Sequence, residues 1–555
     1  MKSPRIVALC MVCLGCSHGT PGSPIPADLV LQNGRIYTMD LALPEVTGLA
    51  VSDGRITMVG TDEEAAAWIG PDTVVEDLGG RAVLPGFVDA HTHLVWGGES
   101  SLIIDLTVAT SMDELLAAVT AYATANPDEA WVQGSGWDAP TFEGQMHKSL
   151  LDAIVPDRPV VLTSADGHSI WVNSVALEMA GITAETPDPA GGVIEHDEDG
   201  EPTGVLRESA SSLVLFLVPP FTKAQDDAGF ATAQALALSL GITTVIDANG
   251  AEEVLGAYAR ADAAGTLRLR VYAAVEAFPS ELYPLQISAI AAMRDEISSE
   301  LLHISGVKFY LDGVLESGTA VLNEPYEDGS NGRQLFTDAQ LDTYFGQADG
   351  EGLQIHVHAI GDGAVRQMLD AIERLPDQAD RRPLAAHIEL IDPVDVLRFA
   401  ELGVYADFQP LWAYPDPYIV DLTIPVIGED RAPWLYPIGS MAASGATLVA
   451  GSDWDVSDMN PFAAMEVAVT RQDPDAPGDV LYEEERVDLA TILAAYTRDG
   501  ARAVFAEDDL GTLTPGKLAD LVVLDRDPFA IGSEELSEVK VLSTWVEGQA
   551  VFRAE

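Results

Sequence analysis

The chain has 555 residues, of which 47% are hydrophobic, and its 88 acidic and 29 basic residues give a formal net charge of −59. This length exceeds that of one compact domain and is enough for a large barrel with additional parts. A surface this acidic repels nucleic acids and anionic lipid headgroups, so the charge argues against both as partners. We attribute the acidity to solubility or salt tolerance, because charge alone identifies no chemistry.

The first 26 residues have the pattern of an export signal. A short basic region, residues 1–5, precedes an apolar run, residues 6–14, that is too short to span a bilayer as a helix. We therefore expect a signal peptide in residues 1–16 and a linker in residues 17–26. Leu14-Gly15-Cys16 resembles the lipobox of bacterial lipoproteins, in which the cysteine is acylated, with Cys13 standing where a leucine is usual.

This N-terminus leaves two destinations open. With Cys16 acylated, the protein is a lipoprotein of the bacterial cell envelope, periplasmic or anchored to the outer membrane, and its membrane contact is limited to that anchor. Without acylation it is secreted. All three cysteines lie in this segment, so the rest of the chain offers neither a disulfide nor a thiolate ligand. Any metal must then be held by His, Asp, Glu or a modified lysine.

The two ends of the remaining chain are rich in short strands and turns. Asn33-Gly34 and Asp53-Gly54 separate short apolar runs near the start, as hairpin turns do, and Glu547-Gly548 lies in a similar setting near the end. Isolated hairpins are only marginally stable and need partners. We therefore expect residues 27–82 and 508–555 to form one small β-sandwich domain.

Between these ends, residues 83–507 alternate strand-like and helical runs, the pattern of parallel β/α units. Eight candidate strands lie in residues 83–94, 241–247, 269–274, 305–310, 353–358, 384–388, 404–408 and 447–453. Eight is the number that a (β/α)8 TIM-like barrel requires. The long interval after the first strand predicts an inserted subdomain, about residues 97–235, lying over the barrel mouth.

Several candidate strands end in polar residues. His91 and His93 share one face of an extended chain, so a single metal ion can bind both. His358 and His387 end two later strands, and Asp453 ends the last. Chemistry in such barrels is located at the C-terminal strand ends, so these residues form a candidate metal site. His356 shares the face of His358 at a deeper position, which fits either a core residue or support for a ligand.

Longer motifs add a family resemblance. Residues 84–93 look like the signature of the amidohydrolase superfamily, and residues 515–523 look like its C-terminal β-domain signature. Four further motifs resemble one branch, amidohydrolase family 3, which includes N-substituted formamide deformylase and related exported enzymes: residues 166–174, 308–313, 358–362 and 451–454. The resemblance covers residues 27–553. Asp455 departs from this branch, which usually has proline there, and we expect it to alter a loop and leave the metal site unchanged.

The resemblance implies a role for each matching residue. His91, His93 and Asp453 would bind a first divalent metal ion, and His358 and His387 a second. Lys308 would bridge two ions, zinc or else Mn, Fe or Co, after carboxylation by carbon dioxide, which requires a neutral amine. Asp453 would accept a proton from the metal-activated water and pass it to the leaving amine. If Lys308 instead pairs with a carboxylate such as that of Asp312, a single-metal site remains workable.

The sequence identifies the substrate-binding residues less clearly than the metal ligands. Asp166 and His168, in the insertion, fit either binding of the substrate carbonyl or leaving group, or a simple turn in which Asp166 caps its neighbours. Arg471 fits a substrate carboxylate or, as we prefer, a surface glutamate.

The expected function is metal-dependent hydrolysis of a carbon–nitrogen bond other than a peptide bond, in an amide or formamide. Alternatives on the same barrel are an ester, lactone or phosphotriester hydrolase, a deaminase, or an inactive surface binding protein. A deaminase would favour one metal and a glutamate proton shuttle. The expected partner is a small-molecule substrate, and the sequence leaves open whether the chain forms a homodimer.

Overall fold

The computed structural model describes residues 24–137, 142, 146–165, 169–189, 192–279, 285–376 and 380–554. Cys16, Asp166 and His168 lie outside these residues. Within the described ranges, no helix combines the length and apolar character needed to cross a membrane.

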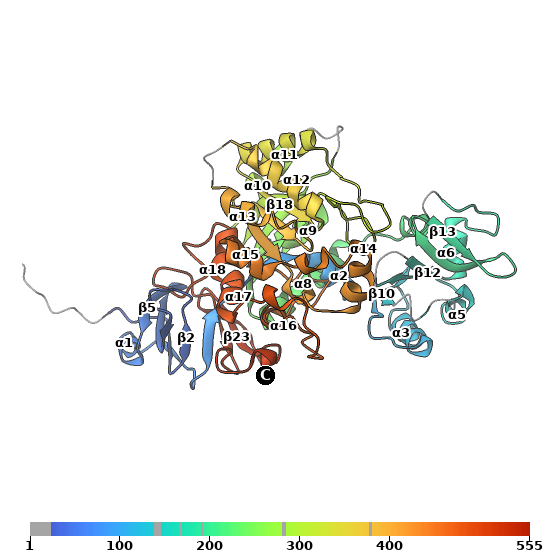
Figure 1. Ribbon diagram of the computed structural model, residues 1–555. Helices are drawn as coiled ribbons and strands as arrows, with labels where there is room; N and C mark the ends of the chain where they lie inside the picture. The colour runs from blue at the N-terminus through green and yellow to red at the C-terminus, as the bar shows by residue number, and fades with distance from the viewer. Residues whose placement is uncertain are drawn as a thin grey trace, which may run out of the picture.

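The centre of the molecule is an eight-stranded, entirely parallel sheet in the order β21-β20-β19-β18-β17-β16-β15-β8 (Figure 1). Its strands are β8 (Phe87–Thr92), β15 (Ile242–Asp247), β16 (Arg270–Glu276), β17 (Leu302–Tyr310), β18 (Gln354–Ala359), β19 (Leu384–His387), β20 (Tyr405–Phe408) and β21 (Thr447–Ala450). Just beyond β21, the Asp453 amide donates to the His91 carbonyl, which brings the first and last strands together. The predicted barrel is confirmed.

Helices cover the outside of this sheet. They are α8 (Lys223–Ser239), α9 (Glu252–Ala263), α10 (Gln286–Ile297), α11 (Asp338–Glu351), α12 (Asp362–Glu373), α13 (Val396–Leu402), α15 (Ile438–Ser444), α16 (Pro461–Thr470), α17 (Leu489–Tyr496) and α18 (Arg498–Ala503). Capping boxes set the start of α8 at Thr222 and of α11 at Thr337. All six residues of β8 and of β15 are buried, as expected of strands covered on both faces.

Both chain ends contribute to a small β domain beside the barrel (Figure 1). One sheet has the order β24-β23-β22-β7-β2-β3, and the other the order β5-β4-β1-β6. The strands are β1 (Leu29–Gln32), β2 (Arg35–Tyr37), β3 (Glu45–Val46), β4 (Gly48–Ser52), β5 (Arg55–Gly60), β6 (Val74–Asp77), β7 (Ala82–Pro85), β22 (Leu521–Leu524), β23 (Val541–Val546) and β24 (Gln549–Arg553). Since β22 pairs with β7, N-terminal and C-terminal residues share one sheet and one core.

The stretch expected to form one strand, residues 83–94, is divided between these two domains. It breaks at Gly86: β7 joins the β domain, and β8 begins the barrel. At Gly86 a Cβ would lie 2.4 Å from the Thr243 hydroxyl, so only glycine fits at the boundary between the two strands. The single-strand prediction was wrong because the apolar run continues across the boundary.

The insertion after β8 forms its own six-stranded sheet, in the order β13-β14-β12-β11-β10-β9, to one side of the barrel in Figure 1. It comprises β9 (Ile104–Asp105), α3 (Met112–Ala125), β10 (Val132–Trp137), α5 (Lys148–Asp152), β11 (Val160–Ser164), β12 (Ser169–Val172), α6 (Ser174–Ala180), β13 (Gly192–His196), β14 (Pro202–Glu208) and α7 (Ser212–Leu215). Its described apolar side chains form cores separate from that of the barrel. The expected range of about 97–235 includes much of α8, whose Phe230 and Ala233 belong to the barrel core.

A buried ion pair joins the β domain to the barrel. Arg270 begins β16, and its guanidinium contacts the carboxylates of Asp520 and Glu547. The Arg270 and Asp520 side chains are 4% and 5% exposed, whereas that of Glu547 is 46% exposed. The acidic partners therefore lie in very different surroundings.

Replacing Asp520 by alanine should lower the free energy of unfolding by about 3–5 kcal/mol, because it leaves a buried guanidinium without its buried partner. Replacing Glu547 by alanine should cost about 1 kcal/mol or less, since an exposed partner is screened by water. Urea unfolding of both variants checks this, and equal losses would contradict it.

Candidate metal centre

His91, His93 and Asp453 meet at the C-terminal end of the barrel. His91 lies in β8, and His93 follows it directly, at the start of α2 (Leu94–Ser100). The Asp453 Oδ1 atom lies 3.0 Å from His93 Nε2 and 3.6 Å from His91 Nε2. Asp453 has a φ of +53°, a left-handed conformation that is uncommon outside glycine and that often accompanies functional sites.

These three residues fit a metal ion. In a tetrahedral site with ligand bonds of about 2.0 Å, neighbouring ligand atoms are about 3.3 Å apart, and the two observed distances bracket that value. Asp453 Oδ1 is buried and has no hydrogen-bond partner among the described residues. Burial acts to raise the pKa of Asp453, but the close contact with the His93 imidazole, together with the nearby His387 and Lys308, lowers that pKa to about 2. The site therefore presents a buried, ionised carboxylate oxygen within 3.0–3.6 Å of two imidazoles.

Lys308 extends from β17 into the same space. Its Nζ lies 3.1 Å from His91 Nε2, and its side chain is fully buried. Burial lowers the pKa of Lys308 to about 8, against the opposing effect of Asp453 and Asp407. About a tenth of the Lys308 amine is thus neutral at pH 7, and carboxylation requires this neutral form.

His358 and His387 complete the cluster, with ring centroids 4.6 Å apart and that of His387 4.8 Å from that of His91. His387 Nδ1 lies 2.8 Å from Gln409 Oε1, and His358 Nε2 lies 3.2 Å from the Gly313 carbonyl. If each of these nitrogens donates to its oxygen, the other nitrogen of each ring keeps a free lone pair for a metal. The structure therefore gathers all six residues that the sequence proposed.

The sequence did not single out two buried residues that support these ligands, Asp407 on β20 and Gln409 just after it. Asp407 Oδ2 lies 3.2 Å from His91 Nδ1. His356 Nε2 lies 3.1 Å from the same nitrogen, which places His356 behind the ligands. The available signal was a carboxylate within the apolar run of residues 404–408.

Two indole rings stack on the histidines. Trp412, in the 3-10 helix η1 (Pro410–Trp412), lies 5.5 Å from His387 with an interplanar angle of 3°. The ring of Trp96, in α2, has its centroid 5.6 Å from that of His93, with an interplanar angle of 16°. These contacts restrict the rotation of both imidazoles and add apolar surface beside the cluster.

Arg471 serves neither role considered from the sequence. Its guanidinium is buried and donates to the backbone carbonyls of Leu481, Tyr436 and Leu435. It joins the end of α16 to two segments, residues 435–436 and the segment at Leu481, without a hydrogen bond to a surface glutamate in the described structure.

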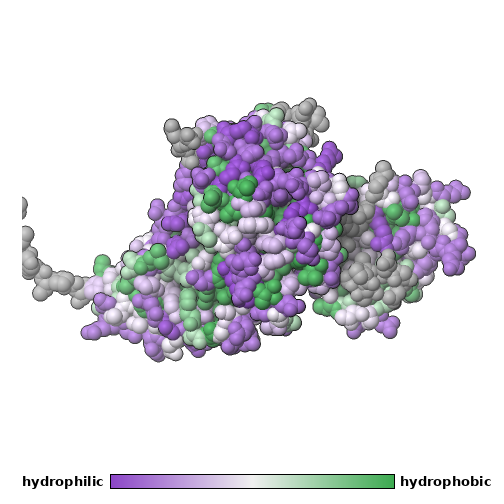
Figure 2. All heavy atoms as spheres, in the orientation of Figure 1, coloured by the Kyte–Doolittle hydropathy of each residue, from purple (hydrophilic) through white to green (hydrophobic). Residues whose placement is uncertain are grey.

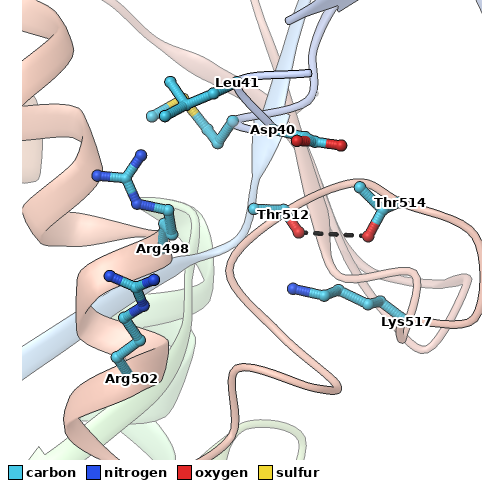
Figure 3. Close-up of a pocket in the computed structure, with 8 residues that line it drawn as sticks. Asp40, Leu41, Arg498, Arg502, Thr512, Thr514 and Lys517 are labelled. Atoms are coloured by element: carbon cyan, nitrogen blue, oxygen red, sulfur yellow. Dashed lines mark hydrogen bonds between the residues drawn. The ribbon is translucent and has the colours of Figure 1, made fainter. Parts of the chain in front are cut away.

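A cavity of about 500 Å³ lies away from this cluster, between the β domain and α18 (Figure 3). Arg498, Arg502 and Lys517 line it, together with Thr512 and Thr514. Its cationic groups already have partners: Arg498 makes a two-bond pair with Asp499, and Lys517 donates to the Leu510 carbonyl. We interpret this cavity as a cleft between domains.

The chain resembles known proteins along almost its full length. The model of the amidohydrolase family matches residues 74–552. Protein LONG AFTER FAR-RED 3 of Arabidopsis thaliana is 33% identical, over 96% of this chain and 93% of that protein. N-substituted formamide deformylase of Arthrobacter pascens is 30% identical, over 94% of this chain and 97% of that enzyme.

A solved structure is similar to this chain along almost its full length. An uncharacterized metal-dependent hydrolase from Pyrococcus furiosus has a TM-score of 0.74 and 29% identity, over 90% of this chain and 99% of that one. These matches confirm the resemblance stated from the motifs. The chain therefore belongs to the amidohydrolase family and is a metal-dependent hydrolase of carbon–nitrogen bonds.

Proposed function

We propose that this enzyme cleaves an amide or formamide bond outside peptides, with water as the nucleophile. The observation that carries the proposal is the buried Asp453 carboxylate, whose Oδ1 lies 3.0 Å from His93 Nε2 and 3.6 Å from His91 Nε2. Similarity to a formamide deformylase over nearly the whole of both chains supports the choice of bond.

We assign the ligands as follows. His91, His93 and Asp453 would hold one divalent ion and His358 and His387 a second, with carboxylated Lys308 as a ligand shared by both; the ions would be zinc, or else Mn, Fe or Co. Such ions supply Lewis acidity that polarises a carbonyl group and makes water more acidic. Carboxylation joins the neutral Lys308 amine to carbon dioxide and releases one proton, converting a cationic side chain into an anionic ligand.

Side chains of the protein transfer the proton and hold the ligands in place. Asp453, ionised at its low pKa, accepts a proton from the attacking water and returns it to the nitrogen of the leaving amine. The stacked indoles of Trp96 and Trp412 keep the imidazoles in place during this exchange. Asp166 and His168, outside the described residues, are proposed to bind the substrate.

We also propose that the enzyme is exported, with residues 1–16 as a lipoprotein-type signal segment that is cleaved before Cys16, so that Cys16 is the acylated N-terminus of a cell-envelope lipoprotein. The basic and apolar segments before Cys16 support this. Mass spectrometry of the mature N-terminus tests it: a lipid-modified Cys16 is expected, and a start beyond Cys16 would refute the anchor.

A substrate panel tests the reaction. Zinc-loaded enzyme is offered an N-substituted formamide, a secondary amide, the ester of the same acid and a phosphotriester, and released amine, alcohol or acid is measured. We expect kcat/KM to be highest for the formamide or the amide. Hydrolysis of the ester or phosphotriester alone would contradict the proposal.

Figure 2 shows hydrophilic residues over most of the visible face of the molecule, in keeping with the excess of 88 acidic over 29 basic residues. A negative surface repels anions. In the same panel, substrates that carry a carboxylate should therefore show lower kcat/KM than their neutral amides at low ionic strength, and added salt should reduce the difference.

A further inference from the structure

The imidazole of His91 has polar groups at both ring nitrogens. At Nε2 lie Lys308 Nζ at 3.1 Å and Asp453 Oδ1 at 3.6 Å. At Nδ1 lie His356 Nε2 at 3.1 Å and Asp407 Oδ2 at 3.2 Å. Asp407 is fully buried, and His91 and His356 are each 1% exposed. The side of His91 that faces away from Lys308 is therefore closed to water.

The position of one proton decides whether His91 can bind a metal through Nε2. A neutral imidazole carries one N–H, so Nε2 has a free lone pair only when the proton is on Nδ1. Burial raises the pKa of Asp407, and the positive charge of Lys308 acts to lower it. In its ionised form the Asp407 carboxylate can only accept, so a hydrogen bond from His91 to it holds the proton on Nδ1. If His356 instead donated to Nδ1, the proton of His91 would be on Nε2, and that nitrogen would be blocked.

We propose that Asp407 is a positioning residue, which fixes His91 in the tautomer that binds metal and orients His356 so that it does not compete. His356 Nε2 lies 3.4 Å from Asp407 Oδ2, so both imidazoles can donate to the same carboxylate oxygen. This inference rests on the proposed metal binding by His91. It adds Asp407, which contacts His91 at the ring nitrogen that does not face Lys308. Histidine ligands of metals commonly donate from that second nitrogen to a carboxylate.

The same three atoms allow one competing interpretation. His91 Nδ1, His356 Nε2 and Asp407 Oδ2 lie close enough together to hold an ion of their own. Their separations of 3.1–3.4 Å are also hydrogen-bond lengths. An ion there would also remove the proton from His91 Nδ1, so that His91 would have to bridge two ions. Hydrogen bonding is the simpler account.

The test compares zinc binding by the full-length enzyme and three variants, using competition with a chromophoric chelator. Asp407→Asn keeps the shape but can turn its NH2 group toward His91 Nδ1 and favour the wrong tautomer. We expect zinc affinity to fall roughly 10–100-fold. His356→Gln removes the competing imidazole and should keep affinity within about threefold of the wild type, because the Asp407 contact remains. Asp226→Asn, a similarly buried carboxylate on α8, is the matched control and should leave affinity unchanged.

The outcomes separate this inference from the proposed function. Wild-type enzyme that binds no zinc overturns the proposed metal site, and this inference with it. If the wild-type enzyme binds zinc and the Asp407→Asn variant binds it with equal affinity, only the proposed role of Asp407 is overturned. Loss of one whole ion in His356→Gln shows that the three atoms are themselves a metal site, which also overturns it. If Asp407→Asn does not fold, ¹⁵N spectra of zinc-loaded wild-type histidines decide: a proton on His91 Nδ1 supports the proposal, and its absence overturns it.

Discussion

Replacing Asp453 by asparagine should reduce kcat by about 10³-fold or more, with the protein still folded. The change removes a charged ligand and also the group proposed to accept a proton, and proton transfer by a positioned side chain alone contributes roughly 10²–10⁴-fold. Neighbouring groups lower the pKa of Asp453, so the wild-type carboxylate is ionised near neutral pH and can accept the proton, whereas an amide cannot. Turnover of the preferred formamide or amide, measured together with bound zinc, checks this.

Asp458→Asn is the matched control, because it makes the same change of charge in the same loop at an exposed residue. Its turnover should remain close to that of the wild type. Asp453→Asn enzyme that keeps a tenth or more of wild-type kcat would contradict the proposed role of Asp453.

Replacing Lys308 by alanine should remove at least one bound ion and lower kcat by about 10³-fold, because Lewis-acid stabilisation of several kcal/mol corresponds to a factor of that order. If carboxylated Lys308 supplies a bridging carboxylate, a short acid such as acetate, entering the cavity left by the side chain, should restore part of the activity. Lys308→Met, whose side chain refills the space, is the control and should not be rescued. If acetate restores activity in neither variant and both variants still bind two ions, Lys308 is not a bridging ligand.

The pKa of Lys308 also predicts how activation depends on pH. Only the neutral amine reacts with carbon dioxide, and burial lowers its pKa from the ordinary 10.5 to about 8, so protonation blocks the reaction below that pH. At fixed carbon dioxide pressure, the initial rate at which metal-free enzyme becomes active should rise roughly tenfold from pH 7 to pH 9 and then level off. Activation that is independent of carbon dioxide would contradict carboxylation.

The barrel and its candidate ligands could be predicted because each rests on a local pattern. A buried parallel strand is an apolar run, and a polar residue where such a run ends marks the open end of the barrel. His91, Lys308 and His387 each stand in or at the end of such a run, so their convergence follows from the fold.

Features that depend on distant partners could not be predicted in this way. At Gly86, where the stretch divides between two sheets, Thr243 leaves no room for a side chain, and Thr243 is more than 150 positions away. Asp407 meets His91 across 316 positions of the chain, and a lone carboxylate in a strand does not reveal that contact. The assignment of α8 to the barrel likewise depends on which core buries Phe230.

The metal content of the natively purified enzyme, measured alongside its activity, tests the central claim most directly. We expect about two divalent ions per chain, loss of amide or formamide hydrolysis when a chelator removes them, and recovery when zinc is returned. A stably folded, metal-free protein that hydrolyses the same substrate at the undiminished rate would contradict it.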